Sequence, residues 1–320
     1  MDQLWVPILT HYRGGSVDPD RMGMHMRSLQ PHVRSVLVAG STGDGWDLDA
    51  RGFDEALEVL RDAEAFSSQV EVLIGLLQPS TERVLARLDQ VTAFLGRTAI
   101  AARIVGVAVC PPVDGDIDQA GIVRHFMAVI DASPWPVSLY QLPQVTGCSL
   151  EPKTVSALAR HRNVAMFKDS SGADLVALAD DDYGDLLLVR GAEGSYAAHL
   201  RPQGRYHGWL LSTGNAFAAP LRDILRAHAD SRFAHAADIS RRLGADIDRL
   251  FADAATVPFG NAFSNANRAA DHILAYGSAG WRNVEPPETI SGLPLPIHLL
   301  ATADRIISEH IETIRSGYLR

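Results

Sequence analysis

Residues 137–168 read VSLYQLPQVTGCSLEPKTVSALARHRNVAMFK, a stretch that begins and ends with a short apolar run. The runs Val137–Tyr140 and Val164–Lys168 have the length of buried strands, and Glu151-Pro152 between them is typical of a helix start. A strand, a helix and a second strand in this order form the repeating unit of a parallel sheet. The stretch therefore predicts one βα unit and the strand that follows it.

The same alternation of apolar runs and helical segments extends over residues 4–211. Right-handed crossovers place the helices outside a sheet that closes after eight parallel strands, so we predict an α/β fold of the (β/α)8 type, a TIM barrel. The predicted strands are Leu4–Leu9, Ser35–Ala39, Val70–Gly75, Ile104–Val109, Val137–Tyr140, Val164–Lys168, Leu186–Val189 and Gly208–Leu211.

Helices alone are predicted after the eighth strand. The first of them, Ala216–Ala229, closes the barrel, and three more are expected at Arg232–Ala254, Ala262–Tyr276 and Ile297–Ile314. No linker rich in Ser and Gly separates these helices from the barrel. We therefore expect a catalytic barrel domain over residues 1–230 and a C-terminal helical domain over residues 231–320 that packs on the barrel.

Composition restricts the kind of partner. A formal net charge of -9, with scattered arginines, argues against nucleic acid and favours a small-molecule substrate. Cys110 and Cys148 are too few for a disulfide framework, and no apolar stretch reaches the roughly 18 residues that a membrane span needs. The N-terminal residues lack the pattern of a secretory signal, so we expect no membrane partner and a cytoplasmic protein.

Lysine usage singles out one residue. The 29 basic residues include only two lysines, Lys153 and Lys168. Lys153 follows a predicted helix start and fits a solvated surface position, whereas Lys168 ends a buried apolar strand. An ammonium group there is costly unless it is paired or chemically used. The two interpretations are an ion pair with a neighbour such as Asp169 and an amine with a chemical function.

Tyr140 and Lys168 end neighbouring strands, so both are predicted to face the cavity at the C-terminal end of the barrel. A lysine amine must be neutral to attack a carbonyl, and apolar surroundings lower its pKa. A tyrosine hydroxyl can then transfer the protons that imine formation requires. The alternative for Tyr140 is a core residue with its hydroxyl satisfied.

A glycine-rich turn follows the second strand, at Gly40-Ser41-Thr42-Gly43-Asp44-Gly45. Its backbone N–H groups and two hydroxyls could hold a carboxylate or phosphate, or they could satisfy each other within the turn.

No pair of His, Asp or Glu residues has the helical spacing of a recognised zinc site. We therefore predict neither a catalytic metal nor a cofactor.

Three motifs resemble the class I aldolase superfamily that includes dihydrodipicolinate synthase and N-acetylneuraminate lyase. Residues 40–44 are similar to that family's Gly-Ser/Thr-Thr-Gly-Glu turn, Tyr140-Gln141-Leu142-Pro143 to its Tyr-Asn-x-Pro, and Lys168-Asp169-Ser170-Ser171 to its Lys-Asp-Ser-Ser. Their order and spacing agree, and the resemblance covers roughly the whole chain. It implies a (β/α)8 barrel with appended helices, usually a homotetramer.

The resemblance also implies roles for individual residues. Lys168 would form an imine, Tyr140 would shuttle protons, and Ser41 and Thr42 would hold the carboxylate of a 2-oxo acid. The catalytic set expected from it is Lys168, Tyr140 and Thr42. The expected substrate-binding set is Ser41, Thr42, Gly43, Gly191 and Leu210.

The chain departs from the pattern of the synthases at several positions. Pro111-Pro112-Val113-Asp114 stands where they have a Tyr-Tyr pair that completes a proton relay, and Val145 stands where an arginine binds aspartate semialdehyde. Lysine biosynthesis is therefore not expected. Asp44 replaces the usual Glu and is a possible site residue at the pocket edge. Asp114 is either a substitute acid or base at the mouth, or a solvated loop residue.

These inferences lead to one hypothesis and two rivals. The hypothesis is a lyase that binds pyruvate or a substituted 2-oxo acid as an imine on Lys168 and makes or breaks a carbon–carbon bond with an aldehyde. The first rival eliminates water from a 2-oxo-3-deoxy sugar acid through the same imine, and the second is a binding protein that has lost turnover. We expect a homo-oligomer, either a dimer or a tetramer.

Overall fold

The computed structural model describes residues 2–100, 102–311 and 316–319 of the chain. Eight parallel strands form a closed barrel, in which each strand pairs with the next along the chain and the last pairs with the first. This confirms the predicted (β/α)8 fold. The strands are β1 Leu4–Pro7, β4 Ser35–Val38, β5 Glu71–Gly75, β6 Arg103–Val109, β7 Val137–Gln141, β8 Val164–Asp169, β9 Leu187–Arg190 and β10 Gly208–Leu210.

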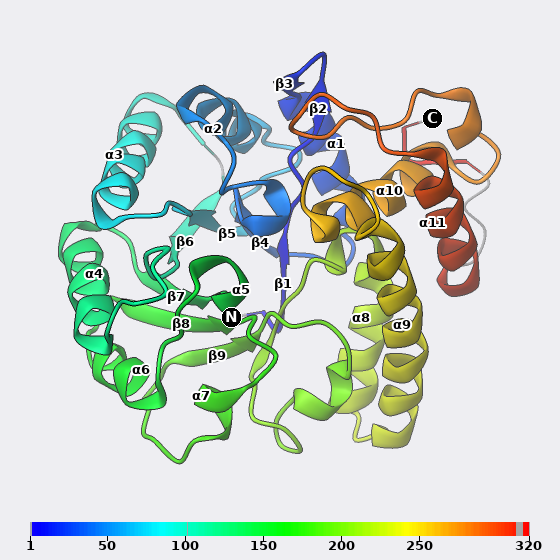
Figure 1. Ribbon diagram of the computed structural model, residues 1–320. Coiled ribbons are helices and arrows are strands. Elements are labelled where there is room, and N and C mark those ends of the chain that lie inside the picture. The colour runs from blue at the N-terminus through cyan, green and yellow to red at the C-terminus, as the bar shows by residue number, and fades with distance from the viewer. Residues whose placement is uncertain (1, 101, 312–315, 320) are drawn as a thin grey trace.

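Helices surround the strands (Figure 1). Four of the helices between strands begin at a side-chain cap, because Asp18, Asp49, Ser80 and Asp118 each accept a hydrogen bond from a backbone N–H of the first turn. The helices between strands are α1 Pro19–Leu29, α2 Ala50–Leu57, α3 Thr81–Arg97, α4 Gln119–Ala132, α5 Pro143–Thr146, α6 Pro152–Ala159 and α7 Leu175–Leu178.

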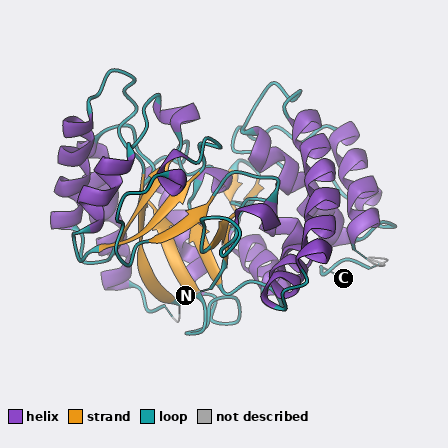
Figure 2. Ribbon diagram, turned by 90° about the horizontal axis from the view of Figure 1, so that it is seen from below, coloured by secondary structure: helices purple, strands orange, loops and turns teal. Residues whose placement is uncertain are grey.

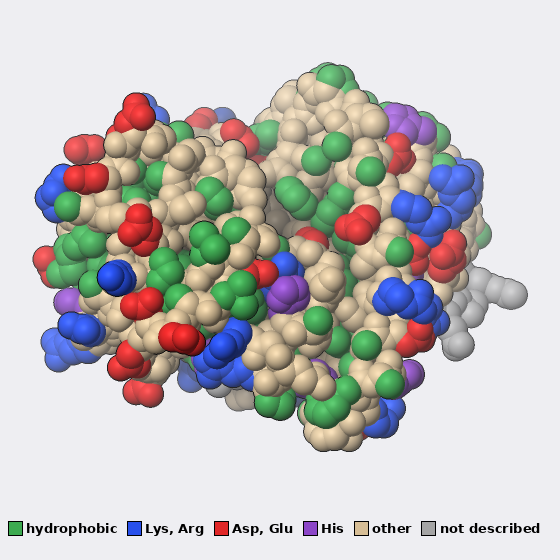
Figure 3. Space-filling model, turned by 60° about the horizontal axis from the view of Figure 1, so that its bottom comes forward, with side chains coloured by type: hydrophobic (Ala, Val, Ile, Leu, Met, Phe, Trp, Pro, Cys, Tyr) green, Lys and Arg blue, Asp and Glu red, His purple; other side chains and the backbone are tan. Residues whose placement is uncertain are grey.

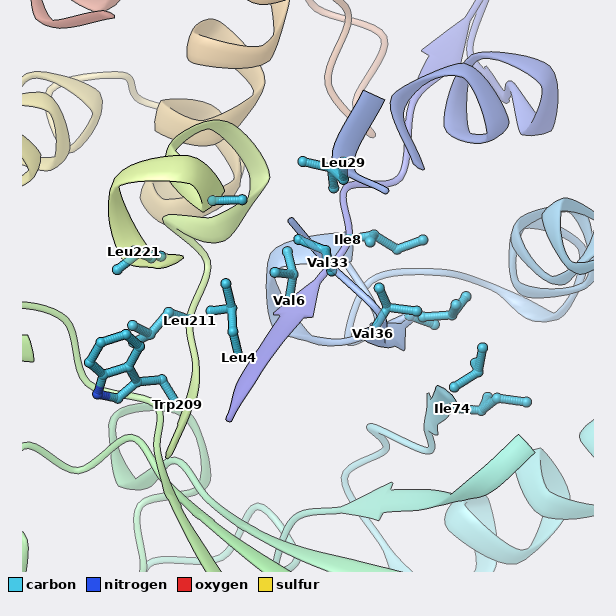
Figure 4. Close-up of a cluster of buried hydrophobic side chains, with 14 of the residues drawn as sticks. Leu4, Val6, Ile8, Leu29, Val33, Val36, Ile74, Trp209, Leu211 and Leu221 are labelled. Carbon is cyan, nitrogen blue, oxygen red and sulfur yellow. The ribbon is translucent and has the colours of Figure 1, made fainter. Parts of the chain in front are cut away.

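Alternating side chains of the strands fill two separate apolar regions. One set points into the barrel and forms a compact cluster of Trp5, Leu37, Leu73, Ala108, Met166, Val189 and Leu210. The other set points outward against the helices, as Figure 4 shows for Leu4, Val6 and Val36 of the strands beside Leu29 of α1 and Leu221 of α8. Because the barrel interior is packed, a substrate has room only at the strand ends.

The chain ends in helices that pack against one side of the barrel (Figure 2). Helix α8, Gly214–Ala229, contacts α9, Phe233–Ala254, and α10, Ala262–Tyr276, contacts α8, α9 and α11, Ile297–His310. Residues 312–314, the end of the predicted last helix, lie outside the described residues. Buried residues of these helices and of the barrel belong to one continuous hydrophobic cluster. A division into two domains stays a prediction.

One element was not expected from the sequence. A small antiparallel hairpin, β2 Tyr12–Arg13 with β3 Ser16–Val17, follows β1. Gly14 and Gly15 form its turn with positive φ values of 59° and 76°, a conformation that glycine adopts at little cost.

Positively and negatively charged side chains are interspersed over the face in Figure 3. No helix among the described residues has both the length and the apolarity to cross a membrane.

Candidate active site

Lys168 lies near the C-terminal end of β8 and points into the barrel. Side chains alternate along a strand, so Lys168 shares the inward face of Met166, which belongs to the interior cluster. The residue is 5% exposed. Asp169 points the opposite way and accepts hydrogen bonds from the Ser171 backbone N–H and hydroxyl, at 2.9 and 2.6 Å, and from Tyr206 at 3.2 Å. The amine is therefore not the ion-pair partner of Asp169.

Burial changes the chemistry of this amine. Removal from water disfavours the ammonium form and lowers the pKa of Lys168 to about 7, although Cys110 and Glu193 act in the opposite direction. A lysine with its ordinary pKa would be almost entirely charged at neutral pH. Near pH 7, Lys168 is instead neutral in a large fraction of molecules, which is the form that attacks a carbonyl.

Tyr140 lies beside the amine because β7 and β8 pair with Tyr140 opposite Lys168. The Lys168 Nζ atom is 3.8 Å from the centroid of the phenol ring. Burial raises the pKa of Tyr140 well above its ordinary value, and hydrogen bonds with Ser170 and Ser41 lower it by less. The phenol is therefore protonated at neutral pH and can donate a proton to a group bound at the amine.

The strand after β8 leaves space for the lysine side chain. Gly191 follows β9 directly, and its N–H donates to the Asp169 carbonyl at 2.6 Å. A Cβ atom at this position would lie 2.1 Å from Ser170 Oγ and 2.6 Å from Lys168 Cε. A larger residue here would therefore force the side chains of Lys168 and Ser170 to shift.

The turn after β4 supplies the third part of the site. Ser41, Thr42 and Gly43 form a short 3-10 helix, so the backbone N–H groups of Ser41 and Thr42 precede its first internal hydrogen bond. Both residues line the cavity above Lys168. Gly43, the third predicted residue of this turn, does not line the cavity. Its N–H donates to the Gly40 carbonyl, and its own carbonyl accepts from Thr10 Oγ1 at 2.7 Å.

These residues enclose one cavity of about 440 Å³ at the C-terminal ends of the strands. Its lining includes Lys168, Tyr140, Ser41, Thr42, Gly191 and Leu210, all of which were predicted as site residues. A larger hollow, of about 710 Å³, lies at the opposite end of the barrel near the starts of β4, β5 and β6. That hollow is lined by neither Lys168 nor Tyr140, which both line the smaller cavity.

The structure adds Glu193 to the cavity, a residue that the sequence did not single out. Its Oε1 atom accepts from the Ser212 hydroxyl at 2.6 Å and from the Thr213 backbone N–H at 3.1 Å. Its Oε2 atom accepts from the hydroxyls of Thr213, at 2.7 Å, and Tyr196, at 3.1 Å. The carboxylate is thus held by four donors. Its position two residues after Gly191 is the signal that could have identified it.

Comparison with known proteins identifies the family of this chain. The dihydrodipicolinate synthetase family matches residues 8–275. The 4-hydroxy-tetrahydrodipicolinate synthase of Xanthomonas axonopodis pv. citri is 32% identical over 222 residues, or 68% of this chain and 68% of that protein. The chain belongs to the dihydrodipicolinate synthetase family. The same-named protein of Stenotrophomonas maltophilia is 29% identical over 194 residues, or 58% of this chain and 61% of the relative.

Solved structures share the fold of this family member. A 2-keto-3-deoxygluconate aldolase variant from Sulfolobus solfataricus has a TM-score of 0.76 at 16% identity, covering 97% of this chain and 98% of the other. The KD(P)GA of T. tenax has a TM-score of 0.73 at 19% identity, covering 97% and 99%. The resemblance predicted from the three motifs is thus confirmed, and the chain is an enzyme of the class I aldolase and lyase type.

Two possible site residues lie outside the cavity lining. Asp114 is exposed in the loop after β6, where its carboxylate accepts from the Asp116 N–H at 3.0 Å. Asp44 is buried behind the turn and pairs with Arg268 of α10 at 2.8 Å. Tyr12 also donates to Asp44, at 2.9 Å. The hydroxyl of Ser264, also in α10, donates to the Thr42 carbonyl at 2.9 Å. Asp44 therefore positions the turn and does not face the substrate cavity.

One group among the described residues has the composition of a metal site, His11, His25 and Asp271. Asp271 already accepts from Tyr318 at 2.6 Å, pairs with Arg21, and lies 2.9 Å from His11 Nε2 and 2.7 Å from His25 Nδ1. Both carboxylate oxygens are therefore occupied by protein donors. The group is an ion-pair network that ties α10 to α1, and it does not line the Lys168 cavity.

Proposed function

We propose that this enzyme binds pyruvate or another small 2-oxo acid as an imine on Lys168 and catalyses aldol cleavage or condensation. The observation that carries the proposal is a buried amine with a pKa of about 7, placed 3.8 Å from the ring of a protonated tyrosine. Few kinds of enzyme reaction other than those of carbonyl compounds use a neutral lysine beside a proton donor.

The proposed reaction begins when the Lys168 nitrogen attacks the C2 carbonyl carbon of the 2-oxo acid. The carbonyl oxygen takes up a proton, and a second proton transfer through Tyr140 allows it to leave as water, which gives the imine. Loss of a proton from C3 then forms an enamine. In the condensation direction C3 attacks the aldehyde carbon, the aldehyde oxygen takes up a proton, and water hydrolyses the imine to free the amine.

The turn after β4 supports the same pose for the 2-oxo acid. The N–H groups of Ser41 and Thr42, together with their hydroxyls, provide hydrogen-bond donors for a carboxylate at the wall of the cavity. Lys168 is the one basic side chain among the described residues that line the cavity. We therefore assign recognition of the carboxylate to neutral donors.

The curated relatives are named synthases, but this chain has Val145 where the resemblance places their semialdehyde-binding arginine. Val145 lines the cavity mouth and is 39% exposed. No side chain there can form an ion pair with a second carboxylate, so we propose an aldehyde other than aspartate semialdehyde. Elimination of water from a 2-oxo-3-deoxy sugar acid is the second candidate, because it uses the same imine and the same proton donor.

Exchange of the methyl protons of pyruvate in D2O, followed by proton NMR, tests the proposal without an acceptor aldehyde. Exchange requires both the imine and the enamine, so we expect it with the native enzyme and expect its loss in Lys168→Met. Native enzyme that binds pyruvate without any exchange would instead support a non-catalytic binding protein. Lys153→Met is the matched control, since Lys153 lies on α6 outside the cavity lining.

A further inference from the structure

The mouth of the Lys168 cavity is bordered by an apolar lip, defined here as Leu142, Val145, Phe251 and Phe263. The rings of Phe251, on α9, and Phe263, on α10, meet edge to face with centroids 4.8 Å apart. Phe263 is 49% exposed. Two phenyl rings held partly exposed at the mouth of a site form a surface suited to apolar ligands.

Several polar groups around the lip are engaged within the protein. All four contacts of the Glu193 carboxylate are with protein donors. The Ser171 hydroxyl donates to Asp169, and Asn261 Oδ1 accepts from the N–H groups of Phe263 and Ser264 as the helix cap. A polyhydroxylated chain that lies against the lip would exchange its hydrogen bonds with water for contacts with apolar side chains.

The charges of the lining point in the same direction. Besides Lys168, the charged side chains that line the cavity are Glu193 and Asp248, and no arginine lines it in the part of the chain that the structure describes. An aldehyde with a carboxylate or phosphate would have no ion-pair partner and would face two acidic groups. The second substrate is therefore expected to carry no negative charge.

We propose that the aldehyde that this enzyme adds to, or releases from, the 2-oxo acid is uncharged and has an aromatic or branched apolar body that lies against the lip. This inference rests on the proposed imine chemistry and specifies its second substrate. A bond forms between C3 of the enamine and the aldehyde carbon, while the aldehyde oxygen takes up a proton. Hydrolysis then releases a 4-hydroxy-2-oxo acid, with the apolar body on C4.

The test is a comparison of three acceptors with pyruvate. Benzaldehyde represents the apolar class, D-glyceraldehyde the hydroxylated class, and succinic semialdehyde the carboxylate-bearing class. We expect kcat/KM for benzaldehyde to exceed the other two by about tenfold or more, which corresponds to ~1.4 kcal/mol of transition-state binding. Equal or greater kcat/KM with glyceraldehyde or with the semialdehyde would overturn the inference.

A pair of variants tests the lip itself. Phe263→Ser removes one ring from the mouth, and Leu293→Ser removes an apolar side chain of similar exposure, 47%, that does not line the cavity. The ratio of kcat/KM for benzaldehyde to that for glyceraldehyde should fall about tenfold in Phe263→Ser and stay unchanged in Leu293→Ser. An unchanged ratio in both variants would remove the lip from the argument.

Reductive trapping with pyruvate separates the two levels of the proposal. An adduct on Lys168 with a preference for glyceraldehyde contradicts only the apolar second substrate. Absence of any adduct contradicts the imine, and the inference about the second substrate falls with it. An adduct together with the benzaldehyde preference supports both.

Discussion

Replacing Gly191 by alanine should displace the amine from its position beside Tyr140. The added Cβ would lie 2.6 Å from Lys168 Cε and 2.1 Å from Ser170 Oγ, whereas carbon atoms in contact are about 3.5–4.0 Å apart. Gly191 does not have a positive φ, so the effect comes from these contacts and not from the backbone. The lysine side chain must then move by roughly 1 Å, a displacement that can lower a rate by about a hundredfold.

The measurement is the rate of pyruvate methyl exchange in D2O, together with the free energy of unfolding in urea. We expect the exchange rate of Gly191→Ala to fall by about a hundredfold while stability falls by only ~1–3 kcal/mol. Gly96→Ala is the control, because a Cβ on this residue of α3 meets no atom within 4 Å. Native exchange in Gly191→Ala would refute the reasoning that the glycine makes room for a reactive amine.

Three further predictions concern the amine, the phenol and the turn. Burial lowers the pKa of Lys168 to about 7, so the neutral fraction should rise from about a tenth at pH 6 to about nine tenths at pH 8. The exchange rate at pyruvate concentrations well below saturation, which depends on the free amine, should rise in the same way; an inflection above pH 9 would contradict the burial argument. Tyr140→Phe keeps the ring but removes the proton donor, so the exchange rate should fall by about 10²–10⁴-fold while circular dichroism shows an intact fold. A rate within a factor of two of the native rate would show that another group transfers the proton. Arg268→Met leaves Asp44 buried without its cation and should lower the free energy of unfolding, measured by urea titration, by about 3–5 kcal/mol. A loss below ~1 kcal/mol would mean that this ion pair does not hold the turn.

The barrel could be predicted because its strands are short apolar runs separated by long helical segments. Each of the eight predicted strands overlaps an observed one, and the predicted helix Ala262–Tyr276 has the observed bounds. The hairpin after β1 was missed because each of its strands has only two residues, too few to show an alternating pattern. Its Gly14-Gly15 pair was the available signal.

Placement at strand ends explains which site residues could be predicted. Lys168, Tyr140 and Gly191 lie at or directly after consecutive strands, so the barrel brings them together whatever the rest of the chain does. Asp44 was expected at the pocket edge, but Arg268, 224 residues further along the chain, draws its carboxylate to the other side of the turn.

The position of the apolar lip at the cavity mouth also could not be predicted from the sequence. Phe251 and Phe263 come from helices whose approach to the cavity depends on how α9 and α10 pack against the barrel. Periodicity marks apolar residues of a helix as buried, and it does not distinguish a ring at a cavity mouth from a ring in the core. Such contacts become visible only in the folded structure.

Reductive trapping on lysine is the most direct test of the central claim, because the chain has only two lysines, Lys153 and Lys168. The enzyme is incubated with pyruvate, reduced with borohydride, and examined by intact-mass measurement and peptide mapping. The imine account predicts a single pyruvate adduct on Lys168 in the native enzyme and in Lys153→Met, and none in Lys168→Met. An unmodified Lys168 in folded, pyruvate-saturated enzyme would contradict it.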